Sequence, residues 1–216
     1  MKLLTALGAA VLGAAMGLQA ASAAETSAET DSAVAARFAA VSGKTLPPVG
    51  FVNFCARNPG DCRSAGRRNN RISMSGERWR IAYQVNNYVN GKVAPVSDQE
   101  LYGESEYWTY PLNAGDCEDY VLMKKRYLEQ LGFARSALLI TVVLDEKNEG
   151  HAVLTLRADD GDYVLDNRHN DIRRWSELEY TYLKRQSGGD PRDWVSFGNE
   201  ALTTSAMLES PEGKDN

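Results

Sequence analysis

The stretch from Gly115 to Gly132 constrains the fold more than any other, because it predicts both ends of one helix. Its apolar residues recur at spacings of three and four, which is typical of one buried helix face. Gly132 is a typical residue to end such a helix. The residues of this face are Val121, Leu122, Tyr127, Leu128 and Leu131. The sequence therefore predicts a helix that begins near Cys117 and packs one side against a core.

Cys117 would lie in the first turn of this helix. The first backbone N–H groups of a helix have no partners within it, and the helix dipole places a partial positive charge at the same end. Both effects favour a thiolate, which is the reactive form of cysteine, so we expect the pKa of Cys117 to be lowered. The alternative is a small buried hydrophobic residue whose neighbours, Asp116, Glu118 and Asp119, are ordinary first-turn acids.

A buried strand and a hairpin are predicted after the helix. Residues Ala137 to Leu144 are nearly all apolar, which is typical of a central strand. Residues His151 to Leu156 alternate as a half-buried strand does, the acidic residues 159–162 contain a turn glycine, and residues 163–166 form the returning strand. The hairpin would bring His151 and Asp166 toward the same end of the sheet.

The register of the hairpin decides which side chain faces His151. If Ala158 pairs with Tyr163, His151 lies opposite Asn170, and Asp166 is four positions away on the same face. A bulge, or a His151 that precedes the strand, would favour Asp166 instead. Either side chain can accept the Nδ1–H of His151 and fix its tautomer, as the third member of a nucleophile, base and orienter set does. The other histidine, His169, is expected in an exposed loop.

The N-terminus predicts export. Lys2 is followed by an uninterrupted run rich in Ala, Leu and Gly from Leu3 to Leu18, and residues 21–23 fit a small-residue cleavage site, so residues 1–23 are predicted to be a signal peptide. A membrane anchor is the alternative, but it needs roughly 18 to 20 strongly apolar residues. After cleavage we expect a flexible leader at 24–45, one domain at 46–200 and a disordered tail at 201–216.

The three cysteines are expected to form one disulfide in an oxidising compartment. Cys55 and Cys62 are close in sequence, with the turn residues Pro59 and Gly60 between them, and are the natural pair. Cys117 is then the free thiol, which exported proteins normally avoid unless the thiol has a function. The formal net charge of −5 gives little electrostatic support to a nucleic-acid-binding role.

Two further segments are notable. Residues 75–90 predict a helix with Ser75 as its cap and Gly91 as its end, although its asparagines are poor helix formers that can bond to neighbouring loops. Residues 92–113 are irregular and rich in aromatic side chains. They are expected to form one wall of a substrate cleft, unless Trp108 and Tyr110 simply cover the core.

The sequence resembles the bacterial transglutaminase-like cysteine peptidases, whose best-known members are periplasmic proteases that release biofilm adhesins. The resemblance extends over about residues 50–197, and the block from Gly115 to Tyr120 is its most specific part. The other matching segments are Val85 to Asn90, Pro95, Asp98, Tyr102-Gly103, Tyr107-Trp108, Pro111, Gly150 to Leu154 and Val164 to Asn167. The loop between Cys55 and Cys62 is more similar to small family members whose substrates are not obvious.

The resemblance implies an α+β fold of the transglutaminase-like or papain-like type, with helices packed on an antiparallel sheet. It implies a cysteine endopeptidase in which Cys117 is the nucleophile, His151 the base and Asp166, rather than Asn170, the orienter. It also implies calcium bound by Asp116, Glu118 and Asp119, whose carboxylates are suitable hard ligands. The implied location is periplasmic or secreted. The implied partners are a protein substrate, for instance a cell-surface or periplasmic protein, and an inner-membrane regulatory receptor.

Two other functions fit the same residues. Transglutaminases use the same triad to transfer an acyl group to an amine instead of water. A calcium-responsive binding module could keep the fold without any chemistry. Formation of an amide product with an added primary amine would identify the first alternative, and an ordinary pKa of Cys117 would favour the second.

Overall fold

The computed structural model describes residues 37–64 and 71–198. The predicted signal peptide, residues 24–36 of the predicted leader and the predicted tail at 201–216 lie outside these ranges. The helices are α2 (Val49–Arg57), α3 (Gly76–Lys92), α4 (Asp98–Tyr102) and α5 (Cys117–Gln130), with short 3-10 helices η1 (Arg135–Ala137) and η2 (Trp175–Glu177). The strands are β1 (Lys44–Thr45), β2 (Ala94–Pro95), β3 (Ala114–Gly115), β4 (Leu138–Leu144), β5 (Gly150–Ala158), β6 (Gly161–Leu165), β7 (Arg173–Arg174), β8 (Thr181–Gln186) and β9 (Trp194–Ser196).

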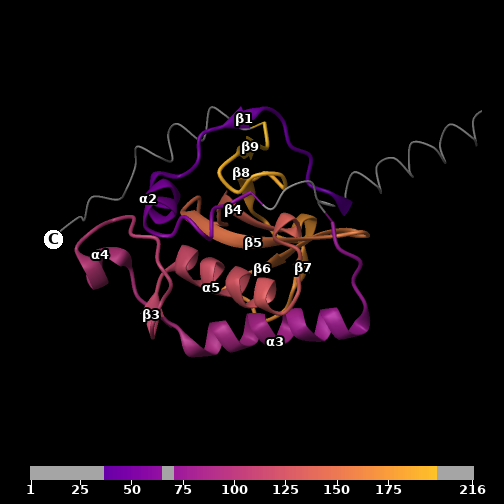
Figure 1. Ribbon diagram of the computed structural model, residues 1–216, viewed down its shortest axis with the longest axis horizontal. Helices are drawn as coiled ribbons and strands as arrows, with labels where there is room; N and C mark the ends of the chain where they lie inside the picture. The colour runs from indigo at the N-terminus through magenta and orange to yellow at the C-terminus, as the bar shows by residue number, and fades with distance from the viewer. Residues whose placement is uncertain (1–36, 65–70, 199–216) are drawn as a thin grey trace, which may run out of the picture. The chain divides into compact units, whose positions relative to one another are not determined.

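A seven-stranded antiparallel sheet forms the centre of the described fold, in the order β1-β9-β8-β4-β5-β6-β7 (Figure 1). The strand β4 is central and nearly all buried, because its sequence is almost entirely apolar. This confirms the strand predicted at 137–144, except that residue 137 belongs to η1. The edge strand β1 lies within the predicted leader and pairs with β9. The strands β2 and β3 form a separate parallel pair.

The hairpin of β5 and β6 is tighter than the predicted one. Ala158 pairs with Gly161, so that only Asp159 and Asp160 form the turn. The predicted pairing of Ala158 with Tyr163 is therefore wrong by two residues. The physical reason is that Asp162, taken as a turn residue, is a fully buried strand residue that is neutralised by arginines. Because the shift is even, every side chain stays on the predicted face of the strand.

The helices α5 and α3 are stacked on the sheet, with α5 between the sheet and α3 (Figure 1). α5 begins at Cys117, as predicted, and ends close to the predicted Gly132. α3 begins after Ser75, whose side chain caps it by accepting from Arg78 N. The prediction that Gly91 ends α3 is wrong, since the helix continues through Gly91 to Lys92.

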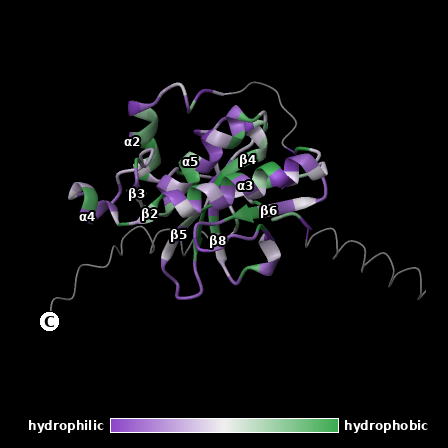
Figure 2. Ribbon diagram, turned by 90° about the horizontal axis from the view of Figure 1, so that it is seen from below, coloured by the Kyte–Doolittle hydropathy of each residue, from purple (hydrophilic) through white to green (hydrophobic). Residues whose placement is uncertain are grey.

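One main hydrophobic core lies between the helices and the sheet. In Figure 2 the strands β4 and β6 are mostly hydrophobic, whereas the loops at their ends are hydrophilic. The predicted disulfide links Cys55 in α2 to Cys62, across 5.6 Å between Cα atoms. Helices on an antiparallel sheet confirm the predicted α+β class. None of the helices formed by residues 37–64 and 71–198 has both the length and the hydrophobicity of a membrane span.

Candidate active site

Cys117 is the first residue of α5 and the one free cysteine of the chain. Asp116 precedes it as the N-cap in an extended conformation. Gly115 is required at the close approach before the helix, because a Cβ there would collide with the side chain of Asp119. The glycine of the Gly-Asp-Cys sequence is therefore required for steric reasons. The two residues that follow it place the thiol at the start of α5.

The surroundings of the Cys117 thiol are acidic. Its Sγ donates to Glu118 Oε2 at 3.2 Å. The backbone N–H of Ala152, next to His151, acts in the opposite direction and lowers the pKa of Cys117. Burial raises the pKa of Cys117 well above its ordinary value, and the carboxylates of Glu118 and Asp116 raise it further. The expectation of a lowered pKa is thus wrong for the protein alone, because burial and neighbouring negative charge raise the pKa of Cys117.

His151 is buried near the start of β5. Its ring Nε2 lies 3.0 Å from Asp166 Oδ1, so Asp166, and not Asn170, is its partner. The bond uses Nε2 rather than the predicted Nδ1. Because an ionised carboxylate can only accept, Nε2 carries the hydrogen and Nδ1 is the nitrogen that remains able to take up a proton.

Asp166 directly follows β6 and is held from several sides. Its Oδ1 also accepts from Arg168 N at 2.9 Å, and its Oδ2 accepts from the hydroxyl of Tyr180 at 2.7 Å. Burial by itself raises the pKa of Asp166, but the hydrogen bonds from His151, Arg168 and Tyr180 outweigh it and hold the pKa below its ordinary range. Asp166 is thus an ionised partner for His151.

The loop that follows Asp166 is bonded to α3. Asn90 Nδ2 donates to the carbonyl of Asp166 at 2.9 Å, and Asn86 Nδ2 donates to the carbonyl of His169 at 3.0 Å. This confirms that the asparagines of α3 bond to a neighbouring loop. The side-chain oxygen of Asn170 accepts from Asn90 Nδ2 at 3.3 Å. His169 lies in this loop, but it is half-buried rather than exposed as expected.

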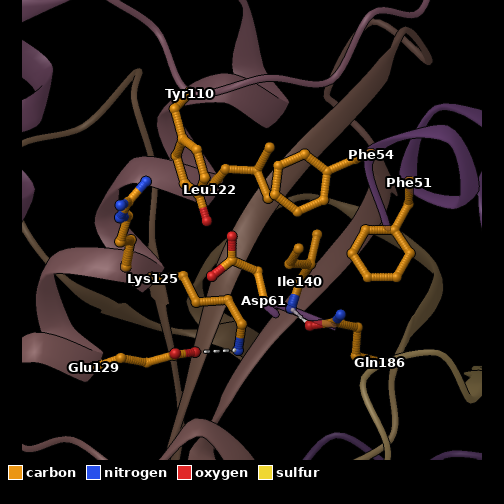
Figure 3. Close-up of a pocket in the computed structure, with 10 residues that line it drawn as sticks. Phe51, Phe54, Asp61, Tyr110, Leu122, Lys125, Glu129, Ile140 and Gln186 are labelled. Carbon is orange, nitrogen blue, oxygen red and sulfur yellow. Dashed lines mark hydrogen bonds and ion pairs between the residues drawn. The ribbon is translucent and has the colours of Figure 1, made fainter. Parts of the chain in front are cut away.

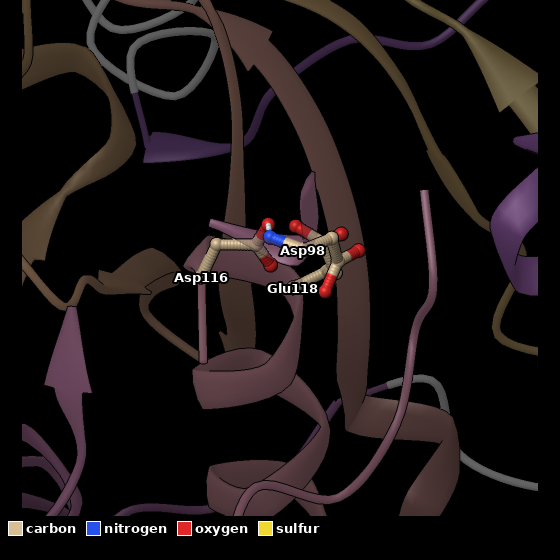
Figure 4. Close-up of side chains that lie close together, drawn as sticks. All are labelled: Asp98, Asp116 and Glu118. Carbon is tan, nitrogen blue, oxygen red and sulfur yellow. Dashed lines mark hydrogen bonds between the residues drawn. The ribbon is translucent and has the colours of Figure 1, made fainter. Parts of the chain in front are cut away.

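Three carboxylates lie together, as Figure 4 shows: Asp98 from α4, and Asp116 and Glu118, which flank Cys117 in the sequence. One ligand oxygen from each lies within 4.8 Å of the others. The buried Oδ1 atoms of Asp98 and Asp116 have no hydrogen-bond partner within the described residues. Burial raises the pKa of Asp98 and of Glu118, and the charge of Asp116 raises both further. An oxygen-rich cluster with unpartnered buried oxygens is suited to a hard cation.

Asp119 is not part of this group. Its Oδ1 accepts from Thr109 N at 2.8 Å, so it fixes the preceding loop instead. Burial raises the pKa of Asp119 to about 8, with further contributions from Asp116 and Asp98. The cluster therefore contains Asp98, which sequence reasoning did not assign to it. Asp98 was named only as part of the family resemblance, 18 residues before Asp116, and no local spacing connects the two residues.

The aromatic segment before Cys117 mainly covers the core. Trp108 is buried against Phe51, with ring centroids 5.8 Å apart, and Tyr110 packs on Phe54 at 5.4 Å. These contacts confirm that Trp108 and Tyr110 cover the core, and the cleft wall at residues 92–113 stays a prediction. A pocket that includes Tyr110 appears in Figure 3, where Lys125 pairs with Glu129, but Cys117, His151 and Asp166 do not line it.

Residues 41–201 match the family described as "Bacterial transglutaminase-like cysteine proteinase BTLCP". Among solved structures, calcium-bound LapG of Legionella pneumophila is 21% identical with a TM-score of 0.45; the match covers 52% of this chain and 66% of that chain, slightly less than two thirds. Another LapG structure is 19% identical with a TM-score of 0.47, and the match covers 63% of this chain and 78% of that chain. EGTA-treated LapG is 17% identical with a TM-score of 0.40, and the match covers 60% of this chain and 78% of that chain. No curated protein sequence matches the chain. Since the family match spans most of the 216 residues, the chain belongs to the bacterial transglutaminase-like cysteine proteinases and has their transglutaminase-like α+β fold.

Proposed function

We propose that this cysteine peptidase is an exported endopeptidase that cleaves a peptide bond through Cys117, His151 and Asp166. The observation that carries the proposal is the 3.0 Å bond between His151 and Asp166. His151 lies on β5 directly before Ala152, whose backbone N–H lowers the pKa of Cys117, so the same strand reaches the thiol. A buried base with a fixed tautomer beside a thiol is the arrangement that nucleophilic catalysis requires.

In the proposed reaction, His151 takes the proton of Cys117 at Nδ1, and the sulfur forms a bond to the carbonyl carbon of the substrate. The backbone N–H of Cys117 stabilises the oxyanion. The tetrahedral species collapses as the C–N bond breaks, and the imidazolium gives its proton to the leaving amine. Water, deprotonated by His151, then attacks the thioester and releases the acid and the thiol. Asp166 keeps His151 oriented and stabilises its charged form throughout.

We propose that Asp98, Asp116 and Glu118 hold calcium, the cation that LapG carries in one of the similar structures. The fit rests on three nearby carboxylates and on two buried oxygens without partners among the described residues. A bound divalent cation supplies positive charge that offsets these carboxylates. In that state the carboxylates of Glu118 and Asp116 would no longer oppose a thiolate at Cys117.

The proposed location is the periplasm or the exterior, because residues 1–23 have the sequence of a signal peptide. The substrate is proposed to be a protein in the same compartment. The Cys55–Cys62 disulfide is consistent with an oxidising environment.

The test is to label the mature protein with a peptide vinyl sulfone in the presence of calcium and after chelation. Wild type should be labelled at Cys117 in calcium and much less after chelation, while Cys117→Ala should be unlabelled and folded. Addition of a primary amine to a cleavage reaction should give free acid, whereas an amide product would identify an acyltransferase. Labelling of Cys117 no faster than that of free cysteine, with or without calcium, would refute the enzymatic proposal and favour a binding module.

A further inference from the structure

Tyr180 contacts two members of the proposed triad at once. Its hydroxyl donates to Asp166 Oδ2 at 2.7 Å, and its ring meets the imidazole of His151 edge-on, with centroids 5.9 Å apart and planes at 82°. The side chain is buried and precedes β8, which is separated from β5 in the sheet by β4. The segment before β8 therefore contacts both His151 on β5 and Asp166 at the end of β6.

The two oxygens of Asp166 have different supports. Oδ1 accepts from both His151 Nε2 and Arg168 N. Oδ2 has one hydrogen-bond donor within residues 37–64 and 71–198, which is the hydroxyl of Tyr180. Without that donor, the carboxylate could rotate about its terminal bond, and a buried oxygen would lack a partner. The direction in which Oδ1 faces His151 is thus held by Arg168 N at one oxygen and by Tyr180 at the other.

Tyr180 is suited to remain a donor. Burial raises the pKa of Tyr180, and its hydrogen bond to the Asp166 carboxylate raises it further, so the phenol keeps its hydrogen. An aromatic side chain also has few rotatable bonds, which makes it a rigid support. Its ring in addition covers the imidazole on one side.

We propose that Tyr180 is a positioning residue that acts through Asp166 and holds His151 in the tautomer with hydrogen on Nε2. The inference deepens the proposed function and rests on it for its catalytic meaning. It assigns the segment before β8 a role in the site.

The chain offers a matched control in Tyr182, two residues further along. Tyr182 is equally buried, but its hydroxyl donates to the main-chain carbonyl of Trp175 at 2.9 Å and not to Asp166. Tyr180→Phe and Tyr182→Phe therefore remove the same atom from similar surroundings. Only the first removes a bond to the triad.

Two measurements on the calcium-loaded protein test the proposal. The first is the rate of iodoacetamide alkylation of Cys117 near pH 7, and the second is the tautomer of His151 by nitrogen NMR, which is tractable because the sequence has only 2 histidines. Tyr180→Phe should slow alkylation about tenfold and give mixed tautomers, whereas Tyr182→Phe should stay within about twofold of wild type with a single tautomer.

If Tyr180 acted on stability alone, Tyr180→Phe would lower the melting temperature, as Tyr182→Phe would, and leave the tautomer of His151 unchanged. That result would overturn the proposal. Equal loss of alkylation in both variants would also overturn it. If wild-type Cys117 reacts no faster than free cysteine, the proposed function fails, and the tautomer of His151 in Tyr180→Phe still decides the role of Tyr180.

Discussion

The two sides of the candidate site differ in how completely the chain supplies hydrogen-bond partners for their buried polar groups. On the histidine side, both oxygens of Asp166 accept hydrogen bonds, and Arg168, which donates to one of them, is itself paired with Asp145 at 2.6 Å. On the cysteine side, burial and neighbouring carboxylates raise the pKa of Cys117. Three buried carboxylate oxygens there, on Asp98, Asp116 and Asp119, lack hydrogen-bond partners within the described residues. The chain alone builds the base and its orienter, whereas the charged groups that shift the pKa of the thiol are acidic.

This difference suggests that the histidine side and the cysteine side have separate roles in the control of reactivity. The hydrogen bonds on the histidine side come from fixed backbone and side-chain groups, so they form when the protein folds. The carboxylates on the cysteine side repel each other until a cation or a proton neutralises them. Reactivity would then be controlled at the thiol and not at the base.

The largest effect is expected from breaking the histidine side. Asp166→Asn should present an amide to His151 and favour the wrong tautomer, lowering the rate of vinyl sulfone labelling at Cys117 by about 10³-fold or more. Asn170→Ala is the matched control, because Asn170 was the alternative partner and lies in the same loop. Its labelling should stay close to wild type. If both variants lose labelling equally, the loop as a whole, and not the carboxylate, orients His151.

The next effect concerns the cysteine side. Calcium at a hundredfold excess over its Kd should stabilise the wild type by about 2.7 kcal/mol and raise its Tm by roughly 5 to 10 °C. Asp116→Ala combined with Glu118→Ala should abolish this response, and Asp98→Asn should reduce it strongly. Asp119→Asn should keep it, since Asp119 bonds to Thr109 N instead. The melting curves of the four proteins with calcium and with chelator decide which carboxylates bind the ion.

The sequence predicted those parts of the fold that local patterns determine. The start of α5 and the strand β4 follow from helical spacing and from a continuous apolar run, and the disulfide follows from a short loop with a turn. The hairpin register was missed because Asp162 looks like a turn residue. It is instead a buried strand residue, held by Arg157 at 3.1 Å and Arg185 at 2.9 Å, and the second arginine comes from a strand that is distant in sequence.

The site itself was only half predictable for the same reason. Cys117 and His151 stand out because they are a free thiol and one of two histidines. Asp98 and Tyr180 reach the site from α4 and from the segment before β8, and nothing in their local sequence marks them. The direction of the Cys117 pKa shift also needed the structure, because burial cannot be read from a helix start.

The smallest effect is expected at a buried lysine of α5 whose charge interacts with Asp166. Lys124 is buried in α5, and its Nζ has no hydrogen-bond partner within the described residues. It lies 5.9 Å from the centroid of the Tyr120 ring. Burial lowers its pKa from 10.5 to about 7, an effect that the charge of Asp166 partly opposes. A buried ammonium without a bond partner should destabilise the fold.

Lys124→Met should therefore increase the free energy of unfolding, by about 1 to 2 kcal/mol below pH 7. Because the folded pKa is depressed, the unfolded chain binds an extra proton between about pH 7 and the ordinary lysine value of 10.5. Wild-type stability should accordingly gain from this group as the pH rises through that window, and the advantage of the variant should shrink. Urea unfolding at several pH values between these limits measures both trends.

Lys125→Met is the control from the neighbouring position. The ammonium of Lys125 is paired with Glu129 at 3.3 Å and donates to the carbonyls of Arg135 and Leu138. Its removal leaves buried acceptors without a donor, so this variant should lose stability where Lys124→Met gains it. Equal destabilisation by the two substitutions would mean that Lys124 Nζ has a hydrogen-bond partner in solution. The buried polar groups near Asp166 would then be satisfied at Lys124 as well.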